Sequence, residues 1–198
     1  MNICVFASRA GSNFKAILDS IKKGYLRSKV FLLITNNPDC GAVKIAKKYK
    51  INQLTINKKL FPELSEKEYS EKFLAALKKH EIEFIVLAGY MKMIPPEVLR
   101  KYRNKIINIH PALLPSFGGK GMYGINVHKA VIASGVKVSG ITVHFVNETY
   151  DEGKIIFQKC CEVKTGDDEF SLQKRVLRME HRYYPIVIKS FEDLEFGI

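Results

Sequence analysis

Short apolar runs alternate with amphipathic stretches along the first half of the chain. Runs typical of buried strands occupy residues 2–7, 30–35, 53–56, 83–88 and 106–109. Between them, apolar side chains recur at helical spacing, which predicts helices over residues 13–23, 41–49, 67–80 and 95–102. This alternation predicts an α/β fold with an open, mostly parallel, Rossmann-like sheet that carries helices on both faces.

The pattern changes after the fifth of these runs. Residues 111–123 hold two prolines and three glycines without strand or helix periodicity, so we expect a functional loop there. A helix is predicted over residues 126–134. The segments 138–146 and 154–163 are β-rich and are joined by an acidic turn, which predicts an antiparallel excursion of strands near the C-terminus.

A long helix is predicted over residues 169–191. Asp167 and Asp168 are expected to cap its first turn, and Pro185 is expected to interrupt or bend it, because proline cannot donate a helical hydrogen bond. The sequence contains no internal repeat, low-complexity stretch or linker. Because 198 residues suffice for one hydrophobic core, we expect a single domain over residues 1–198.

The net charge of the chain and its distribution indicate which class of ligand the protein binds. The formal net charge is +12, and 26% of the residues are charged. The lysines are scattered over amphipathic helices without a dense run or interleaved aromatic residues, as in a solvated surface that attracts small anionic substrates. This distribution favours small-molecule ligands over nucleic acid, and a non-catalytic nucleotide- or RNA-binding module is kept as an alternative.

The N-terminus and the cysteines bear on location and on metal binding. The first strand lacks the basic region of a signal peptide, and no apolar run reaches the roughly 18 residues that a membrane span requires. We therefore expect a cytoplasmic protein without membrane contact. The cysteines have no metal-site spacing, which predicts free thiols and no bound metal; they are Cys4, Cys40, Cys160 and Cys161.

The first candidate site is the loop Ser8–Asn13 between the first strand and the first helix. The N-terminus of that helix offers unpaired N–H groups, Gly11 allows close approach of an anion, and Ser12 and Asn13 add side-chain donors. The loop lacks both the GxGxxG pattern and a Lys-Ser/Thr ending, so a monophosphate is favoured over a dinucleotide or a triphosphate. A plain glycine turn capped by Ser12 is the alternative.

The second candidate site lies at the end of the fifth strand. Asn108 and His110 are two residues apart and therefore project from the same face of that strand, and Pro111 ends the strand. Ligands of open α/β sheets bind at the carboxyl ends of strands, so an amide and an imidazole at this place form a plausible pair of oxyanion donors. The alternative is a histidine that is merely hydrogen-bonded at a strand end.

The third candidate site is the acidic turn, where Asp151 follows a strand that carries His144. On statistics alone, such a turn is a solvated hairpin tip and such a histidine is a hydrogen-bonded sheet residue. Only proximity to His110 would give Asp151 a catalytic role.

Motifs spread over essentially the whole chain carry a resemblance to a known family. They are Ser8–Asn13, Leu87–Ile94, Asn108–Pro115, Val143–Val146 with Asp151, and Glu180–His181. In this order and spacing, the sequence resembles the glycinamide ribonucleotide (phosphoribosylglycinamide) formyltransferase family, one of the folate-dependent formyltransferases.

The resemblance implies transfer of the formyl group of 10-formyltetrahydrofolate, a co-substrate, to the amine of N1-(5-phospho-D-ribosyl)glycinamide in purine biosynthesis. It implies Asn108, His110 and Asp151 as catalytic residues. The implied contacts to the phosphoribosylglycinamide come from Gly11, Ser12, Asn13, Leu177, Arg178, Met179 and Glu180. The implied contacts to the folate come from Met91, Lys92, Met93, Ile94, Asn108, Asn147, Glu148, Thr149, Tyr150 and Asp151.

Two related activities compete with this interpretation. A formyltetrahydrofolate hydrolase would use a similar catalytic trio with water as the nucleophile, but such enzymes usually carry an additional N-terminal domain. A methionyl-tRNA formyltransferase would need an additional C-terminal domain that binds RNA. From the length of 198 residues we expect neither. The expected partners are small-molecule substrates, and the expected assembly is a monomer or a homodimer.

Overall fold

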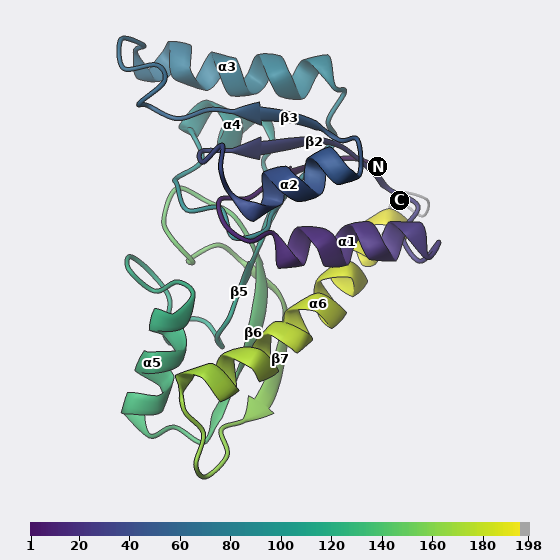
Figure 1. The fold of residues 1–198 in the computed structure, drawn as a ribbon. Helices are drawn as coiled ribbons and strands as arrows, with labels where there is room; N and C mark the ends of the chain where they lie inside the picture. Colours follow the sequence, from purple (N-terminus) through teal and green to yellow (C-terminus); the bar gives the residue numbers. More distant parts are fainter. Residues whose placement is uncertain (195–198) are drawn as a thin grey trace.

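The computed structural model describes residues 1–194 of the chain, which form one continuous sheet with helices on both sides (Figure 1). Within this part of the chain the sheet has seven strands in the order β3-β2-β1-β4-β5-β6-β7. The strands are β1 (Asn2–Phe6), β2 (Lys29–Thr35), β3 (Asn52–Thr55), β4 (Phe84–Leu87), β5 (Ile106–His110), β6 (Val138–Phe145) and β7 (Ile155–Glu162). The first five pair in parallel, and β6 and β7 join antiparallel, so the predicted mixed sheet is confirmed.

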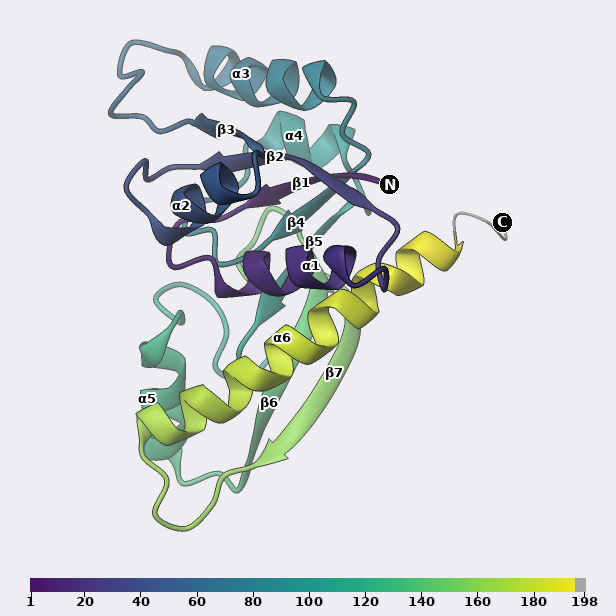
Figure 2. The ribbon, with the colours of Figure 1, turned by 45° about the vertical axis from the view of Figure 1, so that its right-hand side comes forward.

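The helices also lie where the apolar spacing predicts them, with ends shifted by a few residues. They are α1 (Ser12–Lys22), α2 (Gly41–Lys48), α3 (Glu66–Lys79), α4 (Pro96–Lys101), α5 (Ile125–Ser134) and α6 (Glu169–Leu194). Figure 2 shows α1 and α6 crossing the same face of the sheet and α3 lying beyond β3.

Successive residues of β1 face opposite sides of the sheet and enter two separate cores. Ile3 and Val5 belong to the core that also contains side chains of α1, α2, α5 and α6, whereas Cys4 and Phe6 belong to the core that contains side chains of α3 and α4. Because strand side chains alternate between faces, a continuous apolar run is the pattern required of a strand covered on both sides. The predicted helix layers on both faces are therefore confirmed.

The direction in which the chain builds the sheet reverses beside β1. From β1 the chain proceeds through β2 to β3 on one side, and then returns to add β4 and β5 on the other side. In open α/β sheets, ligands bind at the carboxyl ends of the strands where this reversal occurs. A ligand-binding site is therefore expected at the loops that follow β1 and β4.

Pro185 does not interrupt α6, which continues through this residue as one helix. Tyr184, Val187 and Ile188 are buried on either side of it. The Tyr184 hydroxyl donates to the carbonyl oxygens of Leu87 at 2.8 Å and Ile107 at 3.2 Å. This packing holds the helix together despite the missing N–H of the proline.

Asp168 caps α6 as predicted, since its Oδ1 accepts the N–H of Ser171 at 2.7 Å. Between residues 1 and 194, no helix has both the length and the apolar run that crossing a membrane requires.

Candidate functional site

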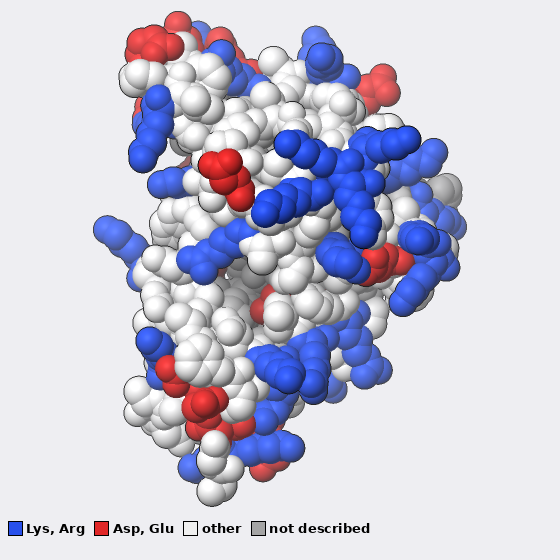
Figure 3. Space-filling view, viewed as in Figure 1, with Lys and Arg blue, Asp and Glu red and all other residues white. Residues whose placement is uncertain are grey.

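A pocket of about 540 Å³ lies at the carboxyl ends of β1, β4 and β5. Its wall contains residues 9–13 after β1, residues 87–94 around the end of β4, and residues 108–111 at the end of β5. Residues 119–124, the turn after β6 and one side of α6 complete it. On the face shown in Figure 3, Lys and Arg side chains gather over α1, α2 and α6 around a hollow.

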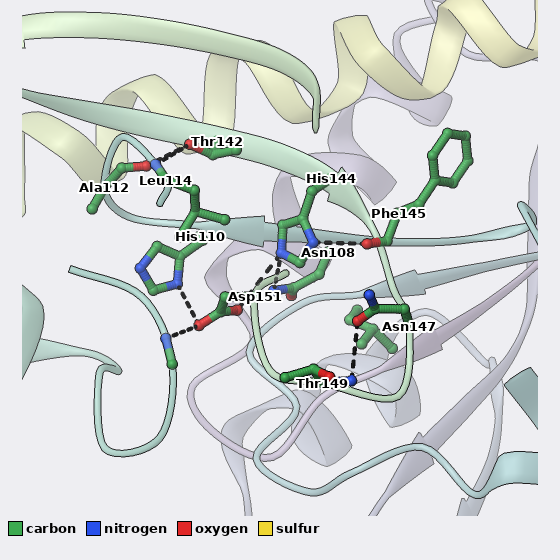
Figure 4. Close-up of polar contacts among 12 residues, drawn as sticks. Asn108, His110, Ala112, Leu114, Thr142, His144, Phe145, Asn147, Thr149 and Asp151 are labelled. Atoms are coloured by element: carbon green, nitrogen blue, oxygen red, sulfur yellow. Dashed lines mark hydrogen bonds and ion pairs between the residues drawn. The ribbon is translucent and has the colours of Figure 1, made fainter. Parts of the chain in front are cut away.

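Four polar side chains converge on the Asp151 side of this pocket (Figure 4). The carboxylate of Asp151 lies 3.4 Å from Nδ1 of His110 and 3.6 Å from Nε2 of His144. Nδ2 of Asn108 lies 3.2 Å from the same Nε2 of His144. The structure therefore brings together Asn108, His110 and Asp151, the three residues that the family resemblance implies for catalysis.

Both ring nitrogens of His110 face acceptors. Nε2 lies 2.8 Å from the carbonyl oxygen of Phe117, and Nδ1 faces the carboxylate of Asp151. A neutral imidazole has only one N–H, whereas an imidazolium has two, so only the imidazolium can donate to both acceptors at once. The side chain is nearly buried, which strengthens its interaction with the carboxylate.

Asp151 reaches the imidazole because the turn between β6 and β7 folds back over the pocket. Its backbone is left-handed, with φ of 60°, a conformation that Asp and Asn tolerate better than most residues. Gly153 allows the close approach, since a Cβ there would lie 1.7 Å from the carbonyl oxygen of Phe145. The N–H of Gly119 donates to Oδ2 of Asp151 at 2.9 Å and so attaches the loop 111–123 to this turn.

His144 fixes the orientation of the Asn108 amide. Its Nδ1 lies 2.8 Å from the carbonyl oxygen of Phe145, which can only accept, so Nδ1 carries the proton and Nε2 of the neutral ring accepts from Asn108. Burial lowers the pKa of His144, the charge of His110 lowers it further, and the Phe145 contact and Asp151 oppose this change. One amide N–H of Asn108 is used by His144, and the second is left for a ligand.

A hydroxyl network holds the start of the loop 111–123. The hydroxyl of Thr142 donates to the carbonyl oxygen of Ala112 at 2.7 Å and accepts the N–H of Leu114 at 3.0 Å. The amide of Gln158 on β7 adds bonds to the Leu114 carbonyl oxygen and to the Thr142 hydroxyl. The loop that lies against His110 and Asp151 is thus fastened to the antiparallel strands.

The glycine loop after β1 forms the opposite wall. Gly11 adopts φ of 76° and precedes α1, whose N-terminus has no side-chain cap. A Cβ at Gly11 would lie 2.8 Å from Cα of Ala42, so glycine is needed for packing as well as for conformation. Uncapped N–H groups at a helix N-terminus suit an anion.

Glu180 on α6 lies beside this loop and is almost fully buried. The amide of Asn13 donates a hydrogen bond to its carboxyl group. Burial raises the pKa of Glu180 to about 7, and the Asn13 contact partly opposes this change. Oδ1 of Asn13 is itself buried and has no hydrogen-bond partner among the described residues.

The residues expected to contact a folate lie on both sides of the pocket. Met91, Lys92, Met93 and Ile94 are in its wall, as are Asn147, Thr149, Tyr150 and Asp151. Glu148 is exposed and is not among the lining residues. The N–H of Met91 donates to Oγ of Ser8 at 3.0 Å, which joins the loop after β4 to the loop after β1.

The family resemblance implies that four consecutive residues of α6 contact the phosphoribosylglycinamide, but only two of them face the pocket. Leu177 and Glu180 line the pocket and are three residues apart, on one face of the helix. Arg178 is exposed, and Met179 packs against the core, so neither is among the lining residues.

The lining residues include His128, to which the sequence assigns no role, and Arg9, for which the sequence predicts only a place in the loop Ser8–Asn13. His128 on α5 is buried, and this burial together with the charge of His110 lowers its pKa to about 4. A lone histidine in a predicted helix carries no signal of a position in a pocket wall. In residues 1–194 no group of three or more His, Cys, Asp and Glu side chains is arranged to hold a metal ion.

Comparison with known proteins identifies the family to which this chain is similar. A family model described as formyl transferase matches residues 1–188. The phosphoribosylglycinamide formyltransferase of Bacillus subtilis (strain 168) is 38% identical over 186 residues, which cover 94% of this chain and 92% of that protein. The chloroplastic phosphoribosylglycinamide formyltransferase of Arabidopsis thaliana is 44% identical over 94% of this chain, and the match spans 63% of the plant protein. The chain thus spans less than two thirds of the length of this plant relative.

A solved structure gives the same result for the fold. The crystal structure of phosphoribosylglycinamide formyltransferase from Bacillus halodurans has a TM-score of 0.88 and 36% sequence identity, over 96% of this chain and 95% of that chain. The family match over nearly the full length and a bacterial relative of similar length together show that the chain belongs to the formyl transferase family, where its relatives are phosphoribosylglycinamide formyltransferases.

Proposed function

We propose that this protein transfers the formyl group of 10-formyltetrahydrofolate to the amine of N1-(5-phospho-D-ribosyl)glycinamide, as a cytoplasmic enzyme of purine biosynthesis. The observation that carries the proposal is the convergence of Asn108, His110 and Asp151 in a pocket whose opposite wall is an uncapped helix N-terminus. The names of the relatives point to the same reaction.

In this reaction the amine nitrogen forms a bond to the formyl carbon, and the bond from that carbon to the folate nitrogen breaks. The amine loses one proton and the folate nitrogen gains one. With a pKa of about 8, an α-amine is neutral to roughly a tenth at pH 7, a cost of only about 1.4 kcal/mol. The larger task is to stabilise the negative charge that develops on the formyl oxygen.

Asn108 and His110 supply the donors for that oxygen. The free amide N–H of Asn108 is oriented by His144. Nε2 of His110 is engaged by the carbonyl oxygen of Phe117, so the donor that His110 offers to the formyl oxygen is the N–H at Nδ1, which it shares with Asp151 at 3.4 Å. Asp151 stabilises the imidazolium and passes the proton from the amine towards the folate nitrogen, directly or through water.

The remaining roles divide between the two walls. Gly11, Ser12 and Asn13 bind the phosphate through the N-terminus of α1, and Glu180 binds ribose hydroxyls. The loop Met91–Ile94 and the turn Asn147–Asp151 hold the folate. The structure gives no pocket contact to support the roles implied for Arg178, Met179 and Glu148.

A folate-release assay tests the proposal. Purified protein is mixed with 10-formyltetrahydrofolate, with and without phosphoribosylglycinamide, and released tetrahydrofolate and formylated product are measured. We expect release that depends on the amine and equals product formation. Release without the amine would identify a hydrolase, and release by His110→Ala at the wild-type rate would contradict the catalytic assignment.

A further inference from the structure

Arg9 occupies a position at the pocket that the catalytic arrangement does not explain. It lies within the loop Ser8–Asn13, two residues before Gly11, it lines the pocket, and its side chain is exposed. None of the ion pairs formed within residues 1–194 includes it. A permanently charged guanidinium therefore lies beside the uncapped N-terminus of α1 without a carboxylate partner.

The other side of the pocket is shaped to receive this guanidinium. Its Cζ lies 5.0 Å from the centre of the Tyr123 ring, within the range of a cation–π contact. A Cβ at Gly124 would lie 2.8 Å from Nη1 of Arg9, and the φ of 56° and ψ of −131° at Gly124 belong to a region used almost only by glycine. The Tyr123 ring and the Gly124 backbone, which has no side chain, thus form the surface against which the Arg9 guanidinium lies.

The groups around the Arg9 guanidinium suit the binding of a sugar phosphate. Gly124 precedes α5, whose N-terminus, like that of α1, has no side-chain cap. Both helices therefore present the positive ends of their dipoles beside Arg9. Oδ1 of Asn13, buried and without a partner among the described residues, supplies an acceptor that a sugar hydroxyl would satisfy.

The carboxylates of the pocket are already engaged. Asp151 accepts from Gly119 and faces His110, and Glu180 accepts from Asn13. Arg9 is therefore left to a ligand rather than to an acidic side chain of the pocket.

We propose that Arg9 is a specificity residue for the phosphate of the substrate. Its guanidinium binds the phosphate together with the N-terminus of α1, while Tyr123 and Gly124 hold the guanidinium in place. Binding of the phosphate thereby fastens residues 119–124, and with them the Gly119 contact to Asp151, over the filled pocket. This inference rests on the proposed function, because it requires a phosphorylated substrate.

The test compares phosphoribosylglycinamide with its dephosphorylated form, ribosylglycinamide, in calorimetric titrations of the wild type and Arg9→Ala. A charge-assisted contact is lost only with the phosphorylated compound, so we expect its Kd to rise about 10- to 100-fold in the variant. The Kd of the dephosphorylated compound should stay within about twofold, since a truncated surface side chain seldom disturbs distant contacts.

Three further variants sharpen the result. Arg9→Lys keeps the charge but loses the planar donors, so we expect an intermediate Kd. Tyr123→Leu should weaken phosphate binding in the wild type but not in Arg9→Ala, because its effect passes through Arg9. Lys120→Ala removes a positive charge from the same pocket, and we expect a smaller change than for Arg9→Ala if the contact is direct.

Hydrogen exchange of residues 115–124 supplies a readout besides affinity. Phosphoribosylglycinamide should protect this segment in the wild type and protect it less in Arg9→Ala. Equal losses of affinity for both compounds, or unchanged protection in Arg9→Ala, would overturn the role of Arg9. Formyl transfer by the wild type is measured in parallel, and its absence would contradict the proposed function itself.

Discussion

The pocket wall that follows β1 and β4 differs from the wall built by β5, β6 and their turn. The first wall offers the N–H groups of a helix N-terminus, held by parallel strands whose side chains are buried in two cores. The second wall offers an amide, two imidazoles and a carboxylate, carried where the sheet turns antiparallel. The first wall presents mainly fixed dipoles, with Glu180 as the titratable group beside them, and the second wall presents several groups that can exchange protons with one another.

This difference separates binding from chemistry. Backbone dipoles keep their charge at every pH, so the N-terminus of α1 attracts an anion without depending on the protonation of a side chain. Polar side chains on the second wall lie 3.2 to 3.6 Å from their neighbours, which is the proximity that general acid–base chemistry requires. Substitutions in the second wall should therefore lower kcat, and substitutions in the first wall should lower substrate affinity.

The largest effect is expected for Asp151→Asn. Asparagine tolerates the left-handed backbone at this position, so the turn should keep its shape while the negative charge is lost. We expect kcat to fall by about 10² to 10³ or more, with comparable losses for Asn108→Ala and His110→Ala. Steady-state kinetics measures kcat, and calorimetry should give a nearly unchanged Kd for phosphoribosylglycinamide. A rise in Kd as large as the fall in kcat would contradict the assignment of binding to the first wall and of chemistry to the second.

The next effect is expected for Gly11→Asp, which places a carboxylate at the anion site and a Cβ against Ala42. We expect the Kd of phosphoribosylglycinamide to rise about 10- to 100-fold, since contacts to a charged group are lost. Gly24→Asp is the matched control, because Gly24 has a similar φ of 74° at the other end of α1 and a Cβ there meets nothing within 4 Å. Equal Kd values for the two variants would rule out the anion site.

A smaller effect is expected for His144→Phe, which keeps a ring but removes the acceptor that orients Asn108. One lost hydrogen bond corresponds to a decrease in kcat of roughly 10-fold. His144 is a positioning residue in this view, so the double variant with Asn108→Ala should be no slower than Asn108→Ala alone. Additive losses would show that His144 acts on the substrate by another route.

The last expected effect is on stability and not on the reaction, and it comes from Glu180→Gln. The folded state raises the pKa of Glu180 from its ordinary value of 4.5 to about 7, so it binds the proton more tightly than the unfolded chain does. Glu180 therefore costs stability progressively as pH rises from about 4.5 to about 7, by at most a few kcal/mol. The Tm of the variant relative to wild type should rise between pH 5 and pH 8. A difference in Tm that does not change with pH would contradict the buried, titrating carboxyl group.

The sequence predicts the parts of the site that depend on local geometry. The two-residue period of a strand places Asn108 and His110 on one face, and a glycine between a strand and a helix marks the N-terminus of α1. In α6, by contrast, the resemblance gives the same role to four consecutive residues, and these cannot all face one side of a helix. Helical periodicity turns Leu177 and Glu180 to the pocket and turns Arg178 and Met179 away.

Other parts depend on contacts between distant segments and could not be read from spacing. Asp151 reaches His110 only because the hairpin turn folds back over the loop that holds Gly119. Glu180 meets Asn13 across 167 positions of the chain, through the packing of α6. His144 has the same sequence pattern as a structural sheet histidine, and only the neighbours supplied by β5 and the turn give it another role.

The pairing of β5 with β6 has an evolutionary consequence. Asn108 lies opposite His144, and Ile109 lies opposite Val143, so polar pairs face the pocket and apolar pairs face the core. A deletion of one residue within β6 would exchange these faces and present a valine to the amide instead of an imidazole. Lineages can therefore vary the length of the neighbouring loops far more freely than the length of this strand.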